Sequence, residues 1–328
     1  MSFELLRGQH TLKTMLAQRV IDKSLSHAIL FNGPAGIGKK SWGRALAQAV
    51  LCETPDLNGA CMNCSSCLRF ATGNNPDYYY LSPEGKHIKI EQLRLIRSRF
   101  YLKSRKKVCL IDSADKMTPE TSSSLLKMME DPPDGLYFIL LTENVSLLLA
   151  TIISRCQSYS IEPLNQDDLG SILDQSSVSP ERKGVIYSLC GGNPGYALSL
   201  AMDAGIEEKI NEVEDILSGL AANKNSAYYA LGISEKLAER EDLFFLLKLL
   251  GIYFREQLLA CHSNESLEII HKTFSSKVKL PLSSTCTEEL IQTIGKAIFA
   301  IERTNINKRL SLEKILIMIQ RKVRICQM

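Results

Sequence analysis

The chain has 328 residues, of which 45% are hydrophobic and 23% are charged, and its formal net charge at pH 7 is +3. This length exceeds one typical domain, and the apolar content is enough for a buried core in each of two or three domains. A net charge so close to zero excludes general electrostatic attraction to nucleic acid, so any such contact would need a local basic patch.

The start of the chain and its cysteines bear on the cellular compartment. Residues 1–4 show no basic segment followed by an apolar run, and no apolar run approaches the roughly 20 residues of a membrane span. We therefore expect a cytoplasmic protein with no secretory signal and no membrane contact. Four of the ten cysteines are clustered at metal-ligand spacing, and in a reducing cytosol such a cluster favours zinc over disulfides.

Buried strands alternate with helices over the first half of the chain. A short apolar run at 27–32 predicts a parallel strand, and a glycine-rich segment joins it to a helix predicted over 39–51. Further along, strands are predicted over 107–112 and 137–141, with a helix over 119–130 between them. This alternation predicts an α/β domain with a mostly parallel sheet.

The strand pattern stops near residue 165, and helix signals follow. Start signals at Asn165, Ser179 and Asn193 predict three short helices. Apolar residues then recur at spacings of three and four over 206–220 and 312–319, which predicts amphipathic helices.

The chain is therefore expected to have three parts. They are an α/β domain over 1–165 with a parallel sheet, a small helical lid over 166–206 and an all-α C-terminal domain over 207–328. Such boundaries are good to about four residues.

The segment after the first predicted strand nearly matches a phosphate-binding loop, or P-loop. Its candidate phosphate-binding residues are Gly33, Gly36, Gly38 and Lys39. The next residue should carry a hydroxyl that ligates magnesium, but it is Lys40. Ser41 comes one position later, about 100° round the helix. The loop thus predicts a degenerate site that could bind ATP or ADP but would hydrolyse it poorly.

A second departure lies at the end of the next predicted strand. Asp112 stands where a Walker B aspartate would hold magnesium, and the following residue, usually a glutamate that orients the attacking water, is Ser113. A serine does not act as a base at neutral pH. The alternative is that Asp112 only caps a strand, but the preceding loop favours the Walker B position. With Lys40, this predicts a chain that does not turn over ATP, while nucleotide binding stays open.

Four cysteines form the most compact candidate site. Cys52, Cys61, Cys64 and Cys67 have the spacing C-x8-C-x2-C-x2-C within an insert at 52–67. Four thiolates make a closed tetrahedral zinc site with no open position, so the Zn²⁺ would be structural. The alternative is a set of unrelated buried cysteines, but the polar residues among them are not typical of a core.

One basic stretch could bind nucleic acid. It contains Arg94, Arg97, Arg99, Lys103, Arg105, Lys106 and Lys107. Candidate contacts to a DNA backbone are Arg94, Arg97, Arg105 and Lys106. The alternative is a solvated helix face and loop, and both remain open. The nearby tyrosines at 78–80 are interpreted as packing residues of a strand.

Several segments together resemble a known family. They are 26–31, the cysteine insert, 75–78, 88–94, 124–133 (Ser-Leu-Leu-Lys-Met-Met-Glu-Asp-Pro-Pro) and 151–156 (Thr-Ile-Ile-Ser-Arg-Cys). With them the chain resembles the delta-prime family of bacterial DNA polymerase III clamp-loader subunits, within the AAA+ superfamily. The resemblance covers residues 1 to about 200 and is only architectural beyond, where the helices resemble the family's collar.

The resemblance implies particular roles. Arg155, with Ser154 and Cys156, would be an arginine finger that enters the ATP site of a neighbouring motor subunit, where its fork stabilises γ-phosphate oxygens. Residues 142–144 fall at the first nucleotide sensor. The second sensor of motor subunits is an arginine, and the corresponding residue of this chain is Gly195.

The implied partners are the gamma/tau motor subunits and the delta subunit, with the sliding clamp and primer-template DNA reached through the complex at the bacterial replisome of the nucleoid. The expected function is that of a non-hydrolysing stator subunit that helps load the clamp onto primed DNA. Two alternatives stay open: an ATP-hydrolysing motor that uses Lys39 and Asp112, and a zinc-containing DNA-binding module that acts alone.

Overall fold

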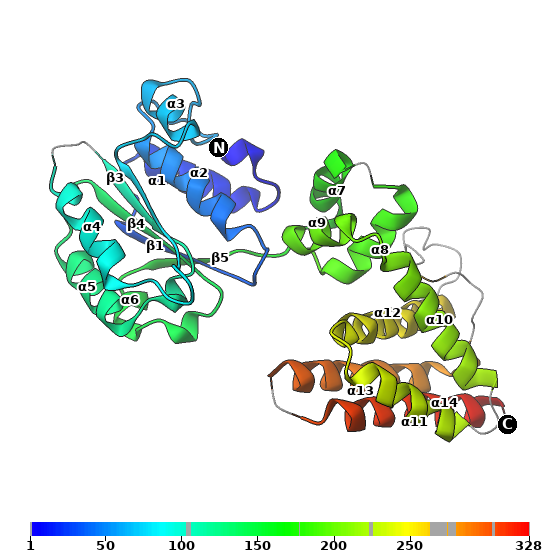
Figure 1. Ribbon diagram of the computed structural model, residues 1–328. Helices are drawn as coiled ribbons and strands as arrows, with labels where there is room; N and C mark the ends of the chain where they lie inside the picture. Colours follow the sequence, from blue (N-terminus) through cyan, green and yellow to red (C-terminus); the bar gives the residue numbers. More distant parts are fainter. Residues whose placement is uncertain are drawn as a thin grey trace. The chain divides into compact units, whose positions relative to one another are not determined.

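The structure, a computed structural model, describes residues 2–102, 106–176, 178–222, 226–262, 274, 280–303 and 306–327. It divides into two compact units. The first comprises Met1–Ile172 with Gly192–Tyr196, and the second comprises Leu173–Gly191 with Ala197–Met328. The first unit carries the sheet, and the described part of the second is helical (Figure 1).

Five parallel strands form the sheet in the order β2-β3-β4-β1-β5. They are β1 (Ala28–Asn32), β2 (Tyr78–Leu81), β3 (Lys107–Ile111), β4 (Leu136–Thr142) and β5 (Gln157–Ser160). The strand β1 lies between β4 and β5 and pairs with both, so that Phe31 is in register with Leu141 on one side and Tyr159 on the other. Because all strands run the same way, the carboxyl ends of β1, β3 and β4 meet at one edge, and the candidate site lies there.

Helices cover both faces of this sheet (Figure 1). On one face lie η1 (Phe3–Leu5), α1 (His10–Ile21) and α2 (Lys39–Leu51), and on the other lie α4 (Ile90–Phe100), α5 (Pro119–Glu130) and α6 (Ala150–Ile153). Side chains of β1 alternate between the two cores, with Phe31 in the first and Leu30 in the second, and both are fully buried. A strand buried on both faces needs an unbroken apolar run, and this confirms the parallel-sheet prediction.

Local signals fix the ends of the predicted helices. The helix α5 begins where the Thr118 side chain accepts a hydrogen bond from the Thr121 amide, with Pro119 in the first turn, and it ends at Glu130 before two prolines. The helix α2 has the predicted bounds and begins after Gly38. These observations confirm the α/β reading of the first half of the chain.

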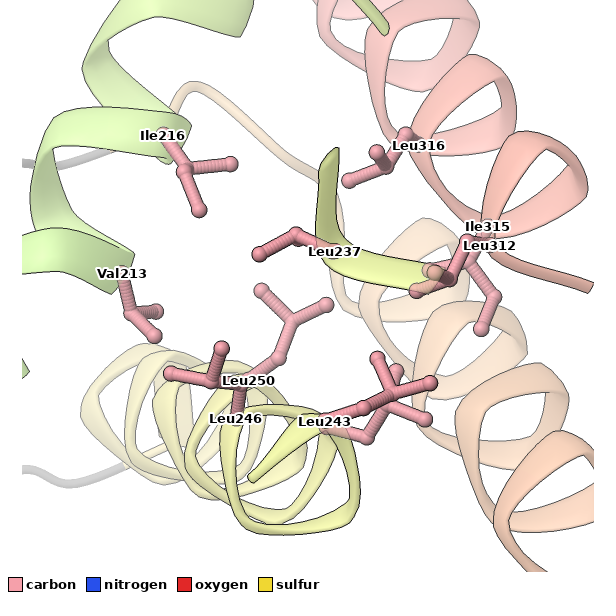
Figure 2. Close-up of a pocket in the computed structure, with 10 residues that line it drawn as sticks. Val213, Ile216, Leu237, Leu243, Leu246, Leu250, Leu312, Ile315 and Leu316 are labelled. Carbon is pink, nitrogen blue, oxygen red and sulfur yellow. The ribbon is translucent and has the colours of Figure 1, made fainter. Parts of the chain in front are cut away.

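Long helices make up the second unit. Beyond α7 (Gln166–Leu173) and η4 (Asp174–Ser176), the helices are α8 (Pro180–Cys190), α9 (Pro194–Met202), α10 (Ile206–Ala222), α11 (Ser226–Ala238), α12 (Leu243–His262), α13 (Ser284–Arg303) and α14 (Lys308–Gln327). The helix α12 packs against α13, and α11 packs against α14. Apolar side chains from α10, α11, α12 and α14 line a small pocket inside this bundle (Figure 2). The residues of the predicted stripe on α10 are buried, and the described C-terminal part is helical, as predicted.

None of the described helices combines the length and the apolar character that a membrane span requires.

Candidate nucleotide site and metal centre

The loop between β1 and α2 is organised around Lys39. The Lys39 ammonium donates to the carbonyl oxygens of Gly33, at 2.7 Å, and Pro34, at 2.8 Å. Gly38 has a φ of 103°, which favours glycine, and no atom lies within 4 Å of the place where a Cβ would stand. The ammonium of Lys39 is therefore held by the loop's own carbonyls.

Lys40 reaches the residue predicted to hold magnesium. Its Nζ lies 3.5 Å from Oδ2 of Asp112 and 4.9 Å from the ring centroid of Tyr80. The Tyr80 hydroxyl in turn donates to the same Asp112 oxygen at 2.7 Å. Hydrogen bonding to Tyr80 and the charge of Asp112 raise the pKa of Lys40 above its usual value, so Lys40 is a cation at neutral pH. A cation of the chain itself therefore neutralises Asp112.

The two lysines of the loop differ in their environment. Burial lowers the pKa of Lys39, while the negative charges of Glu143, Asp112 and Asp115 act in the opposite direction. Lys39 thus lies deeper in the site than Lys40, whose side chain is 55% exposed. Both lysines and several carboxylates therefore lie near the loop at this edge of the sheet.

Ser113 and Thr142, two further positions that matter in ATPases, take part in local structure. Ser113 has a left-handed backbone with a φ of 57° and precedes η2 (Ala114–Lys116). Thr142, the last residue of β4, is fully buried and donates to Asp115 Oδ1 at 2.8 Å, and the Glu143 amide donates to the same oxygen. Asp115 therefore accepts hydrogen bonds from the carboxyl end of β4 and from the residue that follows it.

The start of α9 lies directly on the loop, within the first unit. The Gly195 amide donates to the Gly36 carbonyl at 3.0 Å, and the Asn193 side chain donates to the Ala35 carbonyl at 2.6 Å. A Cβ on Gly195 would stand 2.8 Å from both Cα and O of Gly36. An arginine at position 195 would therefore require the loop or the helix to move.

Arg155 follows α6, away from these loop contacts. Its guanidinium donates to Glu130 Oε1 at 2.8 Å and to the Thr151 carbonyl at 3.1 Å, and its side chain is 37% exposed. The neighbouring Ser154 hydroxyl also donates to Thr151, and burial raises the pKa of the Cys156 thiol to about 12. Arg155 is thus an exposed cation held at one end of α5 by an acid of the same chain.

The four cysteines of the insert meet, as their spacing predicts. Their sulfur atoms all lie within 4.8 Å of one another, and the Sγ atoms of Cys52 and Cys64 are 3.9 Å apart. In a tetrahedral site with Zn–S bonds of about 2.3 Å, neighbouring sulfurs are about 3.8 Å apart, so the cluster fits zinc. Cys52 ends α2, and Cys64 caps α3 (Ser65–Ala71).

Hydrogen bonds and burial act differently on the four sulfurs. The Cys61 amide donates to the sulfur of Cys52, and the Cys67 amide donates to that of Cys64. Hydrogen bonding, mainly to Thr54 and to a smaller extent to the Asn63 backbone, lowers the pKa of Cys61 to about 6. This shift favours the thiolate of Cys61, the form that binds zinc, whereas burial raises the pKa of Cys52 and of Cys67.

The basic stretch is only partly described. Arg94, Arg97 and Arg99 are exposed on α4. Lys106 is half-buried, and burial lowers its pKa, while Lys107 is buried and its ammonium donates to the Leu102 carbonyl. The remaining two, Lys103 and Arg105, lie outside the described residues. Only Arg94, Arg97 and Lys106 of the DNA-contact candidates can thus be placed, and the first two are open to solvent.

The sequence did not predict the contacts of three residues at the candidate site. Tyr80 was interpreted as a packing residue, but its hydroxyl bonds to Asp112. Asp115 and Glu130, the partners of Thr142 and Arg155, had no predicted role. Glu130 stands in the family-like segment 124–133, which was the one signal that could have pointed to it.

Comparisons with known proteins show which family the chain resembles. The family model described as DNA polymerase III, delta subunit, matches residues 8–165. The chain is 30% identical over 310 residues to the DNA polymerase III subunit delta' of Bacillus subtilis, covering 90% of this chain and 91% of that protein. It is 38% identical over 137 residues to the delta' subunit of Pseudomonas aeruginosa, covering 40% of this chain and 42% of that protein.

Two further matches come from other proteins. The Bacillus subtilis subunit tau is 28% identical over 281 residues, covering 78% of this chain and 50% of tau. A crystal structure of a DNA polymerase III gamma subunit-related protein from Thermotoga maritima aligns with 96% of this chain and 99% of that chain, with a TM-score of 0.41 and 18% identity.

Proposed function

The chain belongs to the delta-prime family of DNA polymerase III clamp-loader subunits, and we propose that it serves in that assembly without hydrolysing ATP itself. The ion pair between Lys40 and Asp112 carries the proposal. An ATPase of this class needs a hydroxyl and an acid at these two positions to hold magnesium, and a second acid to orient water. Here an ammonium, an acid that is paired with this ammonium, and Ser113 stand in their place.

Arg155 acts, in this proposal, as an arginine finger in the ATP site of a neighbouring motor subunit. Its exposure and its place in the Ser154-Arg155-Cys156 segment support this role. An ion pair at the surface, such as the one to Glu130, contributes only about 0–1 kcal/mol. The guanidinium can therefore leave Glu130 for phosphate oxygens of a docked subunit at little cost. Hydrolysis in the motor then depends on correct assembly.

The remaining parts have supporting roles. Residues 166–206 act as a lid and residues 207–328 as a collar that joins gamma/tau and delta subunits, while zinc stabilises the insert at 52–67. The complex works in the cytoplasm and places a sliding clamp on primed DNA. The long apolar helices of the C-terminal part and the fit of the four sulfurs to zinc support these assignments.

Reconstitution tests this function. The chain is expected to co-purify with motor and delta subunits, and the complex is expected to hydrolyse ATP faster when primed DNA and clamp are added. Omitting the chain should abolish this stimulation, because the motor would lack its finger. Full stimulation without the chain would contradict the proposal, as would failure to co-purify.

A further inference from the structure

Two cysteine sulfurs meet in the second unit, separate from the four sulfurs of the insert. The Sγ atoms of Cys286, on α13, and Cys326, on α14, lie 3.9 Å apart, although 40 residues separate them in the sequence. The Cys326 thiol donates to the sulfur of Cys286. Both thiols are free and only half-buried, so a small molecule in solution can reach them.

The packing of the two helices keeps these sulfurs together. The helices α13 and α14 contact each other along their lengths, and the buried Leu290 stands one turn after Cys286 on α13. The buried Val323 stands one turn before Cys326 on α14. The Cys286 amide donates to the Ser283 hydroxyl at 3.3 Å, which fixes the first turn of α13. The contact between the sulfurs is therefore set by packed helices and not by a loop.

A positive charge lies beside the pair. The Lys322 ammonium is within hydrogen-bonding reach of Cys286 and forms an ion pair with Glu289. Hydrogen bonding to Glu289, with a smaller contribution from Cys286, raises the pKa of Lys322, so Lys322 is a cation at neutral pH. The thiolate is the form of cysteine that attacks a disulfide, and a neighbouring ammonium stabilises its negative charge. Lys322 is thus placed to support a reaction at the sulfur of Cys286.

The separation of the two sulfurs fits bond formation better than metal binding. The S–S bond of a disulfide is about 2.0 Å long, so the sulfurs need to approach by about 2 Å. Rotation of the two side chains and a small shift of the last turn of α14 can supply this approach, because helix ends fray. A closed zinc site takes four ligands. Among the described residues, only the cysteines of the insert gather three or more potential metal ligands.

We propose that Cys286 and Cys326 form a reversible disulfide that ties α13 to α14 when a low-molecular-weight disulfide is present. The thiolate of Cys286 attacks one sulfur of that disulfide, so a mixed disulfide forms and one small thiolate leaves. Cys326 then loses its proton to water, attacks the Cys286 sulfur and displaces the second small thiolate. Two cysteine thiols are oxidised, and the small disulfide is reduced to two small thiols.

The link responds to the redox state around the protein. An excess of small thiol reverses both exchanges, so the pair stays reduced in a reducing cytosol. The oxidised pair joins the first turn of α13 to the last turn of α14, which are the parts of a helix that otherwise fray. This chemistry is independent of the proposed clamp-loader role.

Peptide mapping of the purified chain tests the site. The folded chain is incubated with glutathione disulfide in the presence of zinc, its remaining thiols are alkylated, and it is digested with trypsin. Trypsin places Cys286 in the peptide 280–296 and Cys326 in the peptide 325–328. Mass spectrometry is expected to find these two peptides joined, with a mass that is lower than their sum by two hydrogen atoms. Dithiothreitol should separate them.

Two variants distinguish this pair from general oxidation of cysteines. Cys326→Ser should lose the joined peptide and carry glutathione on the peptide 280–296, because the second exchange lacks its thiol. The control Cys190→Ser removes a thiol of α8 that donates to the Tyr187 carbonyl, and a serine hydroxyl can donate in the same way. This control should form the joined peptide to the same extent as the wild-type chain.

The outcomes are distinct. A joined peptide in the folded wild-type chain, together with glutathione on Cys286 in Cys326→Ser, supports the site. No joined peptide at millimolar glutathione disulfide, or a joined peptide that forms only after unfolding in urea, would overturn it. Glutathione that persists on Cys286 of the wild-type chain would also overturn it, because a thiol in contact would have completed the exchange.

Discussion

Replacing Arg155 with alanine is expected to lower the ATPase rate of the reconstituted clamp loader by about 10³-fold or more, the usual effect of losing an arginine finger. The guanidinium fork stabilises charge that develops on γ-phosphate oxygens, and alanine offers nothing in its place. Phosphate release in the presence of primed DNA and clamp measures the effect. Arg155→Lys retains the charge but not the fork, so an intermediate rate is expected.

A charge-matched control separates the finger from a general loss of charge. Arg69 is exposed on α3, and Arg69→Ala should leave the rate unchanged. Each variant must also co-elute with the motor and delta subunits, which shows that the complex is intact. An unchanged rate in a complete Arg155→Ala complex would remove the finger from the proposal.

Replacing Cys64 with serine is expected to abolish zinc binding, because it removes one of four sulfurs and the serine hydroxyl is a poor zinc ligand. A metal that binds only the folded chain stabilises it by about 4 kcal/mol at a concentration 1,000 times its Kd, so a loss of this order is expected in the free energy of unfolding. Metal analysis and thermal denaturation measure the two effects. Chelation of the wild-type chain should reproduce both.

The insert is linked to the rest of the first unit, so its loss extends beyond the metal. Cys52 ends α2, whose other end carries the phosphate loop. The Phe3 amide donates to the Asn58 carbonyl within the insert, and Phe3 packs beside Gly59. The matched variant Cys326→Ser lies in the second unit and should retain one zinc. Less than half an equivalent of zinc in the reduced wild-type chain would reject the site.

Most of the first unit could be predicted from local patterns. The bounds of α2 and α5 follow from apolar spacing and from the residues that cap α5, and short spacing alone brings the four sulfurs together. The edge strand β5 was harder to define, since its residues are polar and alternate only between half-buried and exposed. The helix α1 begins after Gln9 in a left-handed conformation with no capping side chain, so no start signal marks it.

The contacts that define the site depend on the order of the strands. Tyr80 reaches Asp112 because β2 lies beside β3, and periodicity says nothing of which strands are neighbours. Glu130 and Arg155 are 25 residues apart and meet only through the packing of α5 and α6. Sequence patterns therefore predicted candidate functional residues but not the partners that restrain them.

The most direct test of the central claim is ATP turnover by the purified chain alone, with magnesium. The predicted rate equals the background given by Lys39→Ala, since neither chain can position a magnesium ion and an attacking water. Magnesium-dependent turnover clearly above that background, and lost in Lys39→Ala, would show that the chain is itself a motor and would contradict the account.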